Sequence, residues 1–314
     1  MRRILMTTDG SNHALTGAHY LGQLFAGTAE IEICILNVSP KIPPLFLEES
    51  HNPRVRRQFE AWRDRIEREA KGYLHEAARV LREAGLKEHQ IQTRHLRQRV
   101  GVARDIIQEA DAEGCDAVVL GKKGMNWLEE YFLGSITTKL LEISENHPVW
   151  VVDGRDFDPK RVLIAMDETE YAVSVAQYVG TMLKGVSGLE VFLYHFCPSG
   201  IQNLDSTEAQ ELQEAGEHWL ERKRMEIMEG FFKEAKQVLE KSGIPGRHIH
   251  TQFFCDISHP DKKISQGILE EVKAEKIGTL VLGRKGSSRA REFRLGSVAL
   301  RTVSAAENCA VWVV

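Results

Sequence analysis

Short apolar runs alternate with longer amphipathic stretches along the whole chain. The apolar runs are rich in Val, Ile and Leu at consecutive positions, as in residues 33–36 (ICIL) and 117–120 (AVVL). Consecutive apolar positions are typical of strands that are buried on both faces of a parallel sheet. The pattern therefore predicts parallel strands separated by helices, which is the order of elements in an α/β fold.

The amphipathic stretches carry their apolar side chains three or four positions apart. Ser11 begins one of them as a candidate helix N-cap. A second runs from about residue 53 to 83 and ends before Gly85, an expected C′ residue, and a matching stretch in the second half ends before Gly243. Because this period is that of an amphipathic helix, we interpret the aromatic side chains in both stretches as core residues.

The second half of the chain repeats the first. Residues 3–9 (RILMTTD) match residues 161–167 (RVLIAMD), and residues 148–152 (PVWVV) match residues 310–314 (AVWVV). The polar join at 153–159 contains Gly and Pro, which suits an exposed linker. We therefore predict two tandem domains, 1–155 and 156–314, each an open doubly wound sheet of five parallel strands with right-handed crossovers.

Composition and charge narrow the class of protein. The 314 residues are 42% hydrophobic and 27% charged, with a net charge of -4, which offers no overall attraction for nucleic acid or an anionic membrane. Five cysteines without a CxxC pair indicate neither a zinc site nor a disulfide framework. The first apolar run ends at Met6, too early for a signal peptide, and no stretch approaches the roughly 20 apolar residues of a membrane span. We expect a cytoplasmic protein.

One glycine pattern follows the fourth predicted strand of each half. Residues 121–135 (GKKGMNWLEEYFLGS) and 283–297 (GRKGSSRAREFRLGS) have identical glycine spacing. Glycines in such a turn permit positive φ and let a ligand approach the backbone. The GS pair would begin a helix, whose free amides and dipole attract anions. The pattern predicts a polyphosphate-binding segment at 121–135 and again at 283–297, which we call the glycine clasp. In the first clasp, Ser135 and the following Thr137 would supply hydroxyl donors.

A carboxylate follows the first predicted strand of each half. Asp9 and Asp167 could accept hydrogen bonds from ribose hydroxyls or an adenine amine, or could instead cap the next helix, which is worth about 1 kcal/mol. Their duplication beside the glycine clasps favours ligand binding. Neither half contains GxxxxGK[ST] or GxGxxG, so the sequence does not indicate a P-loop NTPase or a dinucleotide dehydrogenase.

This combination of a strand ending in Asp, a GxxG turn and a GS pair resembles the universal stress protein family, specifically its nucleotide-binding branch, over essentially the whole chain. The resemblance implies a HUP or adenine-nucleotide alpha-hydrolase-like fold that binds ATP, or AMP or ADP, with Mg²⁺ as a further candidate ligand. Val38 would lie at the adenine, and the phosphates on the GxxG and GS elements. The implied first site comprises Asp9, Val38, Gly121, Gly124, Gly134, Ser135 and Thr137, and the second comprises Asp167, Phe196, Gly283, Gly286, Gly296 and Ser297.

Basic residues lie inside both clasp loops, and the two halves differ in detail. Lys122 and Arg284 are candidates for phosphate contact, with a solvated loop as the other interpretation. Ala299 replaces the hydroxyl of Thr137, and bulky Phe196 replaces Val38. We therefore expect tighter ATP binding in the first half.

Three functions are compatible with these motifs. The favoured one is a stress-response regulatory protein in which ATP orders the clasp and changes a surface presented to a protein partner. A slow ATPase or an autophosphorylating enzyme is the alternative, but the sequence lacks a catalytic constellation of diagnostic spacing. An interaction protein with vestigial clasps is the third, against which the intact glycines of both halves argue.

The last predicted strand of each half suggests how the halves associate. Residues 149–152 and 311–314 are apolar and carry no charge, and such edge strands tend to pair. In the family that the chain resembles, these strands pair across a dimer. We expect the halves to pack as an internal pseudo-dimer with Trp150 and Trp312 at the contact, and a homodimer of whole chains remains open.

Overall fold

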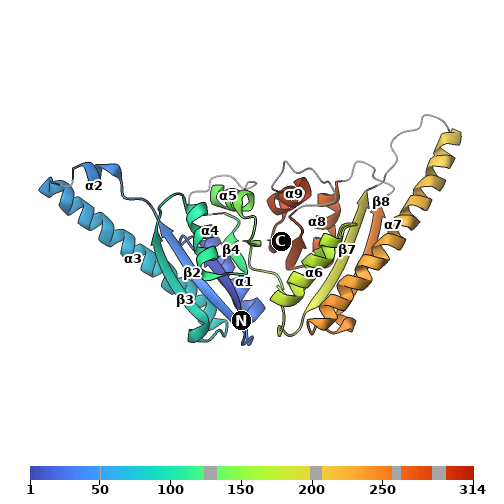
Figure 1. Cartoon of the computed structure of the whole chain (residues 1–314), viewed down its shortest axis with the longest axis horizontal. Helices are drawn as coiled ribbons and strands as arrows, with labels where there is room; N and C mark the ends of the chain where they lie inside the picture. The colour runs from blue at the N-terminus through green and yellow to red at the C-terminus, as the bar shows by residue number, and fades with distance from the viewer. Residues whose placement is uncertain (50, 124–132, 199–206, 257–262, 285–294) are drawn as a thin grey trace. The chain divides into compact units, whose positions relative to one another are not determined.

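The computed structural model describes the chain except at residues 50, 124–132, 199–206, 257–262 and 285–294 (Figure 1). The chain divides into two compact units, Met1–Arg155 and Asp156–Val314. Each unit is a layered α/β structure with helices on both faces of a sheet. In unit 1, α1 packs beside α3 on one face, while α4 packs beside α5.

Unit 1 is an open parallel sheet. Its elements in chain order are β1 (Arg2–Thr7), α1 (Asn12–Phe25), β2 (Ile31–Ser39), α2 (Pro44–Glu48), α3 (Pro53–Glu83), a 3-10 turn (Glu88–Gln90), β3 (Ile91–Arg97), α4 (Val102–Glu113), β4 (Ala117–Gly121), α5 (Ser135–Ile143) and β5 (Val149–Asp153). The strands pair in the order β3-β2-β1-β4-β5. The order of the strands reverses between β1 and β4, and open α/β sheets bind ligands at such a point.

Unit 2 repeats this plan. Its elements are β6 (Arg161–Ala165), α6 (Glu170–Met182), β7 (Glu190–Pro198), α7 (Thr207–Lys241), a 3-10 turn (Gly246–His248), β8 (Ile249–Asp256), α8 (Ile264–Ala274), β9 (Thr279–Leu282), α9 (Ser297–Ala305) and β10 (Cys309–Val313). Its strands pair in parallel in the order β10-β9-β6-β7-β8. Two tandem five-stranded parallel sheets confirm the predicted fold class.

Local sequence signals account for the ends of the elements. The consecutive apolar residues of β1, Ile4–Met6, are fully buried, as expected for a strand covered on both faces. The Ser11 hydroxyl accepts a hydrogen bond from the Ala14 amide (3.1 Å) and so caps α1. Gly85 and Gly243 follow α3 and α7 with φ of +104° and +99°, a conformation that favours glycine.

Each unit buries the tryptophan of its closing strand against its own first helix. The Trp150 ring lies 6.4 Å from the rings of both Tyr20 and Phe25 on α1, and the Trp312 ring lies 6.2 Å from that of Tyr178 on α6. Both indoles are fully buried. Each therefore contributes to the core of its own unit, and its role in holding the two halves together stays a prediction.

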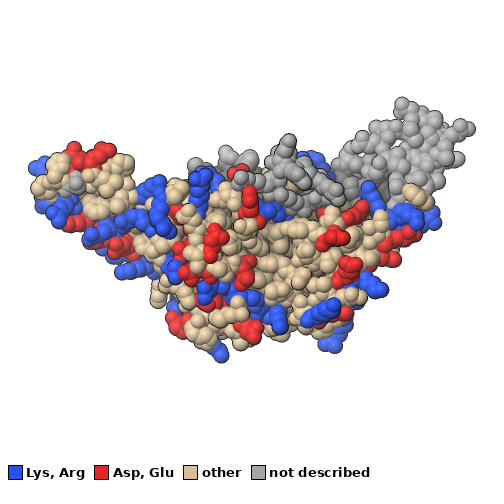
Figure 2. Space-filling model, in the orientation of Figure 1, with Lys and Arg blue, Asp and Glu red and all other residues tan. Residues whose placement is uncertain are grey.

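The exposed face of α3 is charged but mixed in sign. Figure 2 shows Lys and Arg interleaved with Asp and Glu along this helix. Ion pairs one turn apart join Arg56 to Glu60 (3.7 Å) and Arg65 to Glu69 (3.9 Å). Within the described residues, no helix is both long enough and apolar enough to cross a membrane.

Candidate functional site

A cavity of about 530 Å³ opens at the carboxyl ends of β1, β2 and β4 in unit 1. The ends of these strands and the first turn of α5 form its floor. Helices α3 and α4 supply the walls, with the side chains of Ile66, Glu69, Ala70, Tyr73, Val102 and Ile106. The cavity thus lies where the strand order reverses, which is the common ligand position in this class of sheet.

The cavity brings together most of the residues predicted for the first site. Those that line it are Asp9, Val38, Gly121, Gly134, Ser135 and Thr137. They come from four different elements or the turns that follow them. Lys122 is not among the lining residues, and Gly124 lies outside the described residues.

Asp9 holds the turn between β1 and α1. Its Oδ1 accepts a hydrogen bond from the Ser11 amide (3.0 Å), whereas Ser11 itself caps the helix. The carboxylate is therefore not the helix cap, which was the other interpretation of this residue. Gly10, with φ +82°, adds to the turn because a Cβ there would lie 2.2 Å from the Tyr73 ring. Asp9 is thus held at the rim of the cavity, partly exposed.

Gly121 differs from its prediction. It is the last residue of β4, and its φ is not in the positive range. A Cβ at this position would lie 2.3 Å from the carbonyl oxygen of His13 in α1. The glycine is therefore required by the close approach of the first turn of α1, and the expectation of a positive φ was wrong.

The first turn of α5 presents backbone donors to the cavity. Gly134 is the N-cap, and its amide donates to the Lys122 carbonyl oxygen (3.0 Å). The first intrahelical bond runs from the Thr138 amide back to Gly134 (2.9 Å). The amides of Ser135 and Ile136 therefore have no intrahelical acceptor, and the positive end of the helix dipole lies with them. This end of the cavity favours an anion.

Thr137 serves a different purpose from the one predicted. Its hydroxyl is buried and donates to the carbonyl oxygens of Gly121 (3.3 Å) and Lys122 (3.4 Å). The hydroxyl hydrogen is thus engaged with the backbone, and only the oxygen can interact with a ligand. Thr137 fixes α5 to the end of β4, because one side chain spans both.

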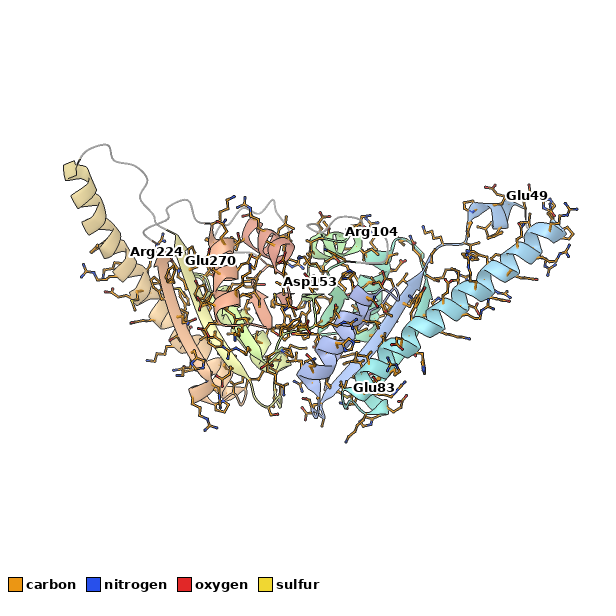
Figure 3. All side chains as sticks on the ribbon, turned by 180° about the vertical axis from the view of Figure 1, so that it is seen from behind. Glu49, Glu83, Arg104, Asp153, Arg224 and Glu270 are labelled. Carbon is orange, nitrogen blue, oxygen red and sulfur yellow. The ribbon has the colours of Figure 1, made fainter. Side chains whose placement is uncertain are left out.

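Lys122 also differs from both of its predicted roles. Its side chain is only 5% exposed, and its Nζ lies 3.6 Å from Oδ2 of Asp153. Asp153, labelled in Figure 3, is the last residue of β5. The amide of Lys122 donates to the Val152 carbonyl oxygen (2.9 Å). The residue braces β4 against β5 and is neither solvated nor directed into the cavity. The neighbouring Lys123 lines the cavity instead.

A buried polar residue of β2 supports the turn, and sequence reasoning missed it. Asn37 donates through Nδ2 to the carbonyl oxygen of Thr8 (2.8 Å) and lines the cavity. Its counterpart His195 makes the same bond through Nδ1 to the carbonyl oxygen of Met166 (2.8 Å). Burial lowers the pKa of His195, which favours the neutral ring with the proton on Nδ1. The signal in the sequence was a polar residue inside each apolar run.

The second predicted site has an aromatic ring at the position that corresponds to Val38. The Phe196 ring is buried, stacks on Phe254 at 5.9 Å and lies 2.3 Å from where a Cβ of Gly267 would stand on α8. Asp167 accepts a hydrogen bond from the Thr169 hydroxyl (2.5 Å). The aromatic ring thus occupies space that Val38 leaves open in unit 1.

The second clasp repeats the backbone bonds of the first. The Arg284 amide donates to the Val314 carbonyl oxygen (2.7 Å), and the Gly296 amide donates to Arg284 (2.8 Å). Arg284 is buried, as Lys122 is. Gly283 and Gly296 are partly exposed, and Ser297 is the exposed first residue of α9. Gly286 lies outside the described residues.

Fold and site together define an α/β protein of two tandem parallel-sheet units, each with a strand-end turn and a helix N-terminus at the switch point. The model of the universal stress protein family matches residues 1–153 and 159–314. The chain therefore belongs to the universal stress protein family and carries its domain twice.

Solved structures of similar fold cover the whole chain. A universal stress protein from Archaeoglobus fulgidus aligns with a TM-score of 0.62 and 18% identity over 99% of this chain and 97% of that one. A protein of unknown function from Pseudomonas aeruginosa PAO1 aligns with a TM-score of 0.60 and 17% identity over 100% of this chain and 92% of that one. At this level of identity the likeness shows the fold. A comparison with curated proteins found no match.

Proposed function

We propose that unit 1 binds an adenine nucleotide, with ATP as the first candidate, in the cavity at the switch point. The observation that supports this most strongly is that one cavity joins the carboxylate of Asp9 to the N-terminus of α5. A carboxylate suits ribose hydroxyls, and helix amides suit phosphate oxygens. A nucleotide carries both groups on one molecule.

The rest of the lining fits the parts of such a ligand. Val38, Val102 and Ile106 provide an apolar region at one end, which suits a base. Ser135 and Lys123 add a hydroxyl and a cation near the helix amides, at the end proposed for the phosphates. Within the described residues, no group of three or more His, Cys, Asp or Glu could hold a metal ion. Mg²⁺, if used, would therefore enter with the phosphates.

We propose further that unit 1 binds the nucleotide more tightly than unit 2. Phe196 fills the position of Val38, and Ala299 cannot replace the Thr137 hydroxyl that fixes α5 to β4. In the cell, the protein would act as a stress-response regulator, as membership of the universal stress protein family suggests. A ligand that contacts both the turn after β1 and the first turn of α5 would change the surface around the cavity.

The test begins with the protein as purified. The chain is denatured, released nucleotides are identified by mass spectrometry, and the stripped protein is titrated with ATP, ADP and AMP by calorimetry. We expect about one equivalent of an adenine nucleotide, with micromolar rebinding. Absence of released nucleotide together with no heat for any of the three would refute the proposal.

Two matched variants locate the site. Gly134→Asp places a carboxylate at the N-terminus of α5 and should weaken binding at least tenfold by charge repulsion. Gly134→Ala is the control, because it adds the same Cβ, 3.3 Å from the Lys122 carbonyl oxygen, without the charge, and φ at Gly134 is -58°. Gly296→Asp makes the same change in unit 2 and should alter the affinity little. A dominant effect of Gly296→Asp would assign the main site to unit 2.

A further inference from the structure

The arginine at the end of β3 has no anionic partner. Arg97 is the last residue of this strand, and its side chain forms no ion pair within the part of the chain that the structure describes. Its Nε is buried there without a hydrogen-bond partner. Its Cζ lies 5.9 Å from the centre of the Trp62 ring on α3, a contact that uses none of the N–H groups. By contrast, Arg94 on the same strand pairs with Glu109 and Glu113.

The neighbours of Arg97 continue into the cavity of unit 1. Ser39 is directly opposite Arg97 in the register of β2 and β3 and lines the cavity. Ile66, four residues after Trp62 and so on the same face of α3, lines it as well. Helix α3 packs against both strands (Figure 1). Arg97 therefore lies at the border of the cavity, on the side away from α5, because β1 and β2 separate β3 from β4 in the sheet.

Positive charge exceeds negative charge around this border. His95 shares a face of β3 with Arg97, and its Nε2 lies 3.0 Å from Oγ of Ser39. Burial lowers the pKa of His95, and the cations Arg97 and Lys71 lower it further, whereas the carboxylate of Glu67 acts in the opposite direction. The imidazole is therefore neutral at pH 7 and lies beside two cations and one anion. A bound anion would balance this charge.

The arrangement belongs to unit 1 and is not required by the fold. Unit 2 has Cys197 and Phe253 at the register positions of Ser39 and His95. Its strands nevertheless pair in the same order. The polar groups at this end of the sheet are thus not needed to form it. Arg97 is also half-buried, so a ligand from solvent can reach it.

We propose that Arg97 is the centre of an oxyanion-binding site that takes a phosphoryl group at the β3 side of the cavity. A guanidinium presents its N–H donors in a planar fork that matches the oxygens of a phosphoryl group. Lys71 adds a second positive charge nearby. The phosphoryl group belongs either to the ligand of the cavity or to a separate phosphate ion. The site does not depend on the nucleotide proposed above.

The experiment follows His95 by NMR in the full-length protein with isotope-labelled histidine. The signal is assigned by its loss in His95→Gln, and inorganic phosphate is then added at constant ionic strength. We expect a saturable shift with a Kd of about 1 mM or below, and a rise in the pKa of His95 of about one unit at saturation. No saturable shift, or an equal shift when sodium chloride replaces phosphate, would overturn the proposal.

Variants locate the site. Arg97→Gln should weaken phosphate binding at least tenfold and remove the rise in the pKa of His95. Arg97→Lys keeps the charge without the fork and should retain part of the affinity. Arg68→Gln, which removes an exposed arginine of α3, is the matched control and should leave phosphate binding unchanged. Thermal unfolding verifies that each variant is folded. Phosphate binding by a folded Arg97→Gln variant with the affinity of wild type would contradict the proposal.

A second titration, with ATP present, identifies the source of the phosphoryl group. If phosphate still shifts the His95 signal at saturating ATP, the site takes a separate ion. If ATP alone shifts the signal and phosphate then adds nothing, the site takes a phosphoryl group of the cavity ligand. A protein whose His95 responds to phosphate but that gives no heat with ATP would support the oxyanion site and count only against the nucleotide.

Discussion

Gly121→Ala tests why the clasp begins with glycine. The added methyl carbon would lie 2.3 Å from the carbonyl oxygen of His13, 2.7 Å from its carbonyl carbon and 3.2 Å from the amide nitrogen of Ala14. All three atoms belong to the backbone of the first turn of α1, so no side-chain rotation can relieve the overlap. Helix α1 must move away from β4, or the end of β4 must bend.

The expected cost is at the upper end of the range for an overpacked core. Inserting one methyl group into a well-packed site costs about 1–3 kcal/mol, and a rigid backbone partner favours about 3 kcal/mol. The displaced turn also carries the Ser11 cap, worth about 1 kcal/mol. For a unit of this size we expect the melting temperature of unit 1 to fall by about 6–12 °C.

The assay compares two glycine substitutions in the same unit. Urea titration followed by circular dichroism gives the free energy of unfolding for wild type, Gly121→Ala and Gly72→Ala. A Cβ at Gly72, inside α3, meets no atom within 4 Å, so this variant should gain about 0.5–1 kcal/mol from helix propensity. If Gly121→Ala stays within about 0.5 kcal/mol of wild type, close packing against α1 is not what requires glycine there.

Further variants test the cavity, the 3-10 turn before β3 and the stability of unit 1 at low pH. Val38→Phe copies the ring of Phe196 into the cavity and should weaken ATP binding at least tenfold in calorimetric titration. The reverse change, Phe196→Val, should create or strengthen ATP binding in unit 2. Unchanged affinities in both variants would contradict the idea that the ring takes up the space of the ligand. Gln90→Ala should lower the free energy of unfolding in urea by about 2–3 kcal/mol, because its buried Nε2 donates to two backbone carbonyl oxygens at 2.8 and 3.1 Å. Burial would raise the pKa of Asp105, but hydrogen bonds from backbone amides outweigh it and hold the pKa below its usual value. The Asp105 carboxylate thus stabilises the folded state fully above about pH 4, and this stabilisation is lost as the pH falls through the pKa of Asp105 in the folded state. Asp105→Asn should therefore lower the free energy of unfolding at pH 7 and make it depend less on pH in the acid range. Parallel curves of stability against pH for the variant and the wild type would show that Asp105 does not contribute.

Much of the fold could be predicted from local patterns. The apolar runs, the Ser11 cap and the glycines after α3 and α7 each depend on residues close together in sequence, and the repeat doubled every signal. The parallel direction of the strands followed from the alternation of strands and helices. These features are set by periodicity and backbone preference, which a sequence displays directly.

The candidate site was predictable in its positions but less so in its roles. Asp9, Val38 and Ser135 do line one cavity, because the ends of parallel strands meet at one edge of a sheet. Which way a side chain points was not predictable. Lys122 turns to Asp153 while the adjacent Lys123 lines the cavity, and two lysines in a row give no sign of that difference.

The sequence by itself determined the repeat, the class of fold, the helix ends and the meeting of the acidic turn with the glycine clasp. Tertiary structure alone decided that Gly121 is needed for the approach of α1, that the Thr137 hydroxyl is used on the backbone, and that the Phe196 ring is buried against Gly267 of α8. The reason is physical. Patterns of short range depend on neighbours along the chain, whereas clearance, hydrogen-bond partners and burial depend on elements that meet only when the chain is folded.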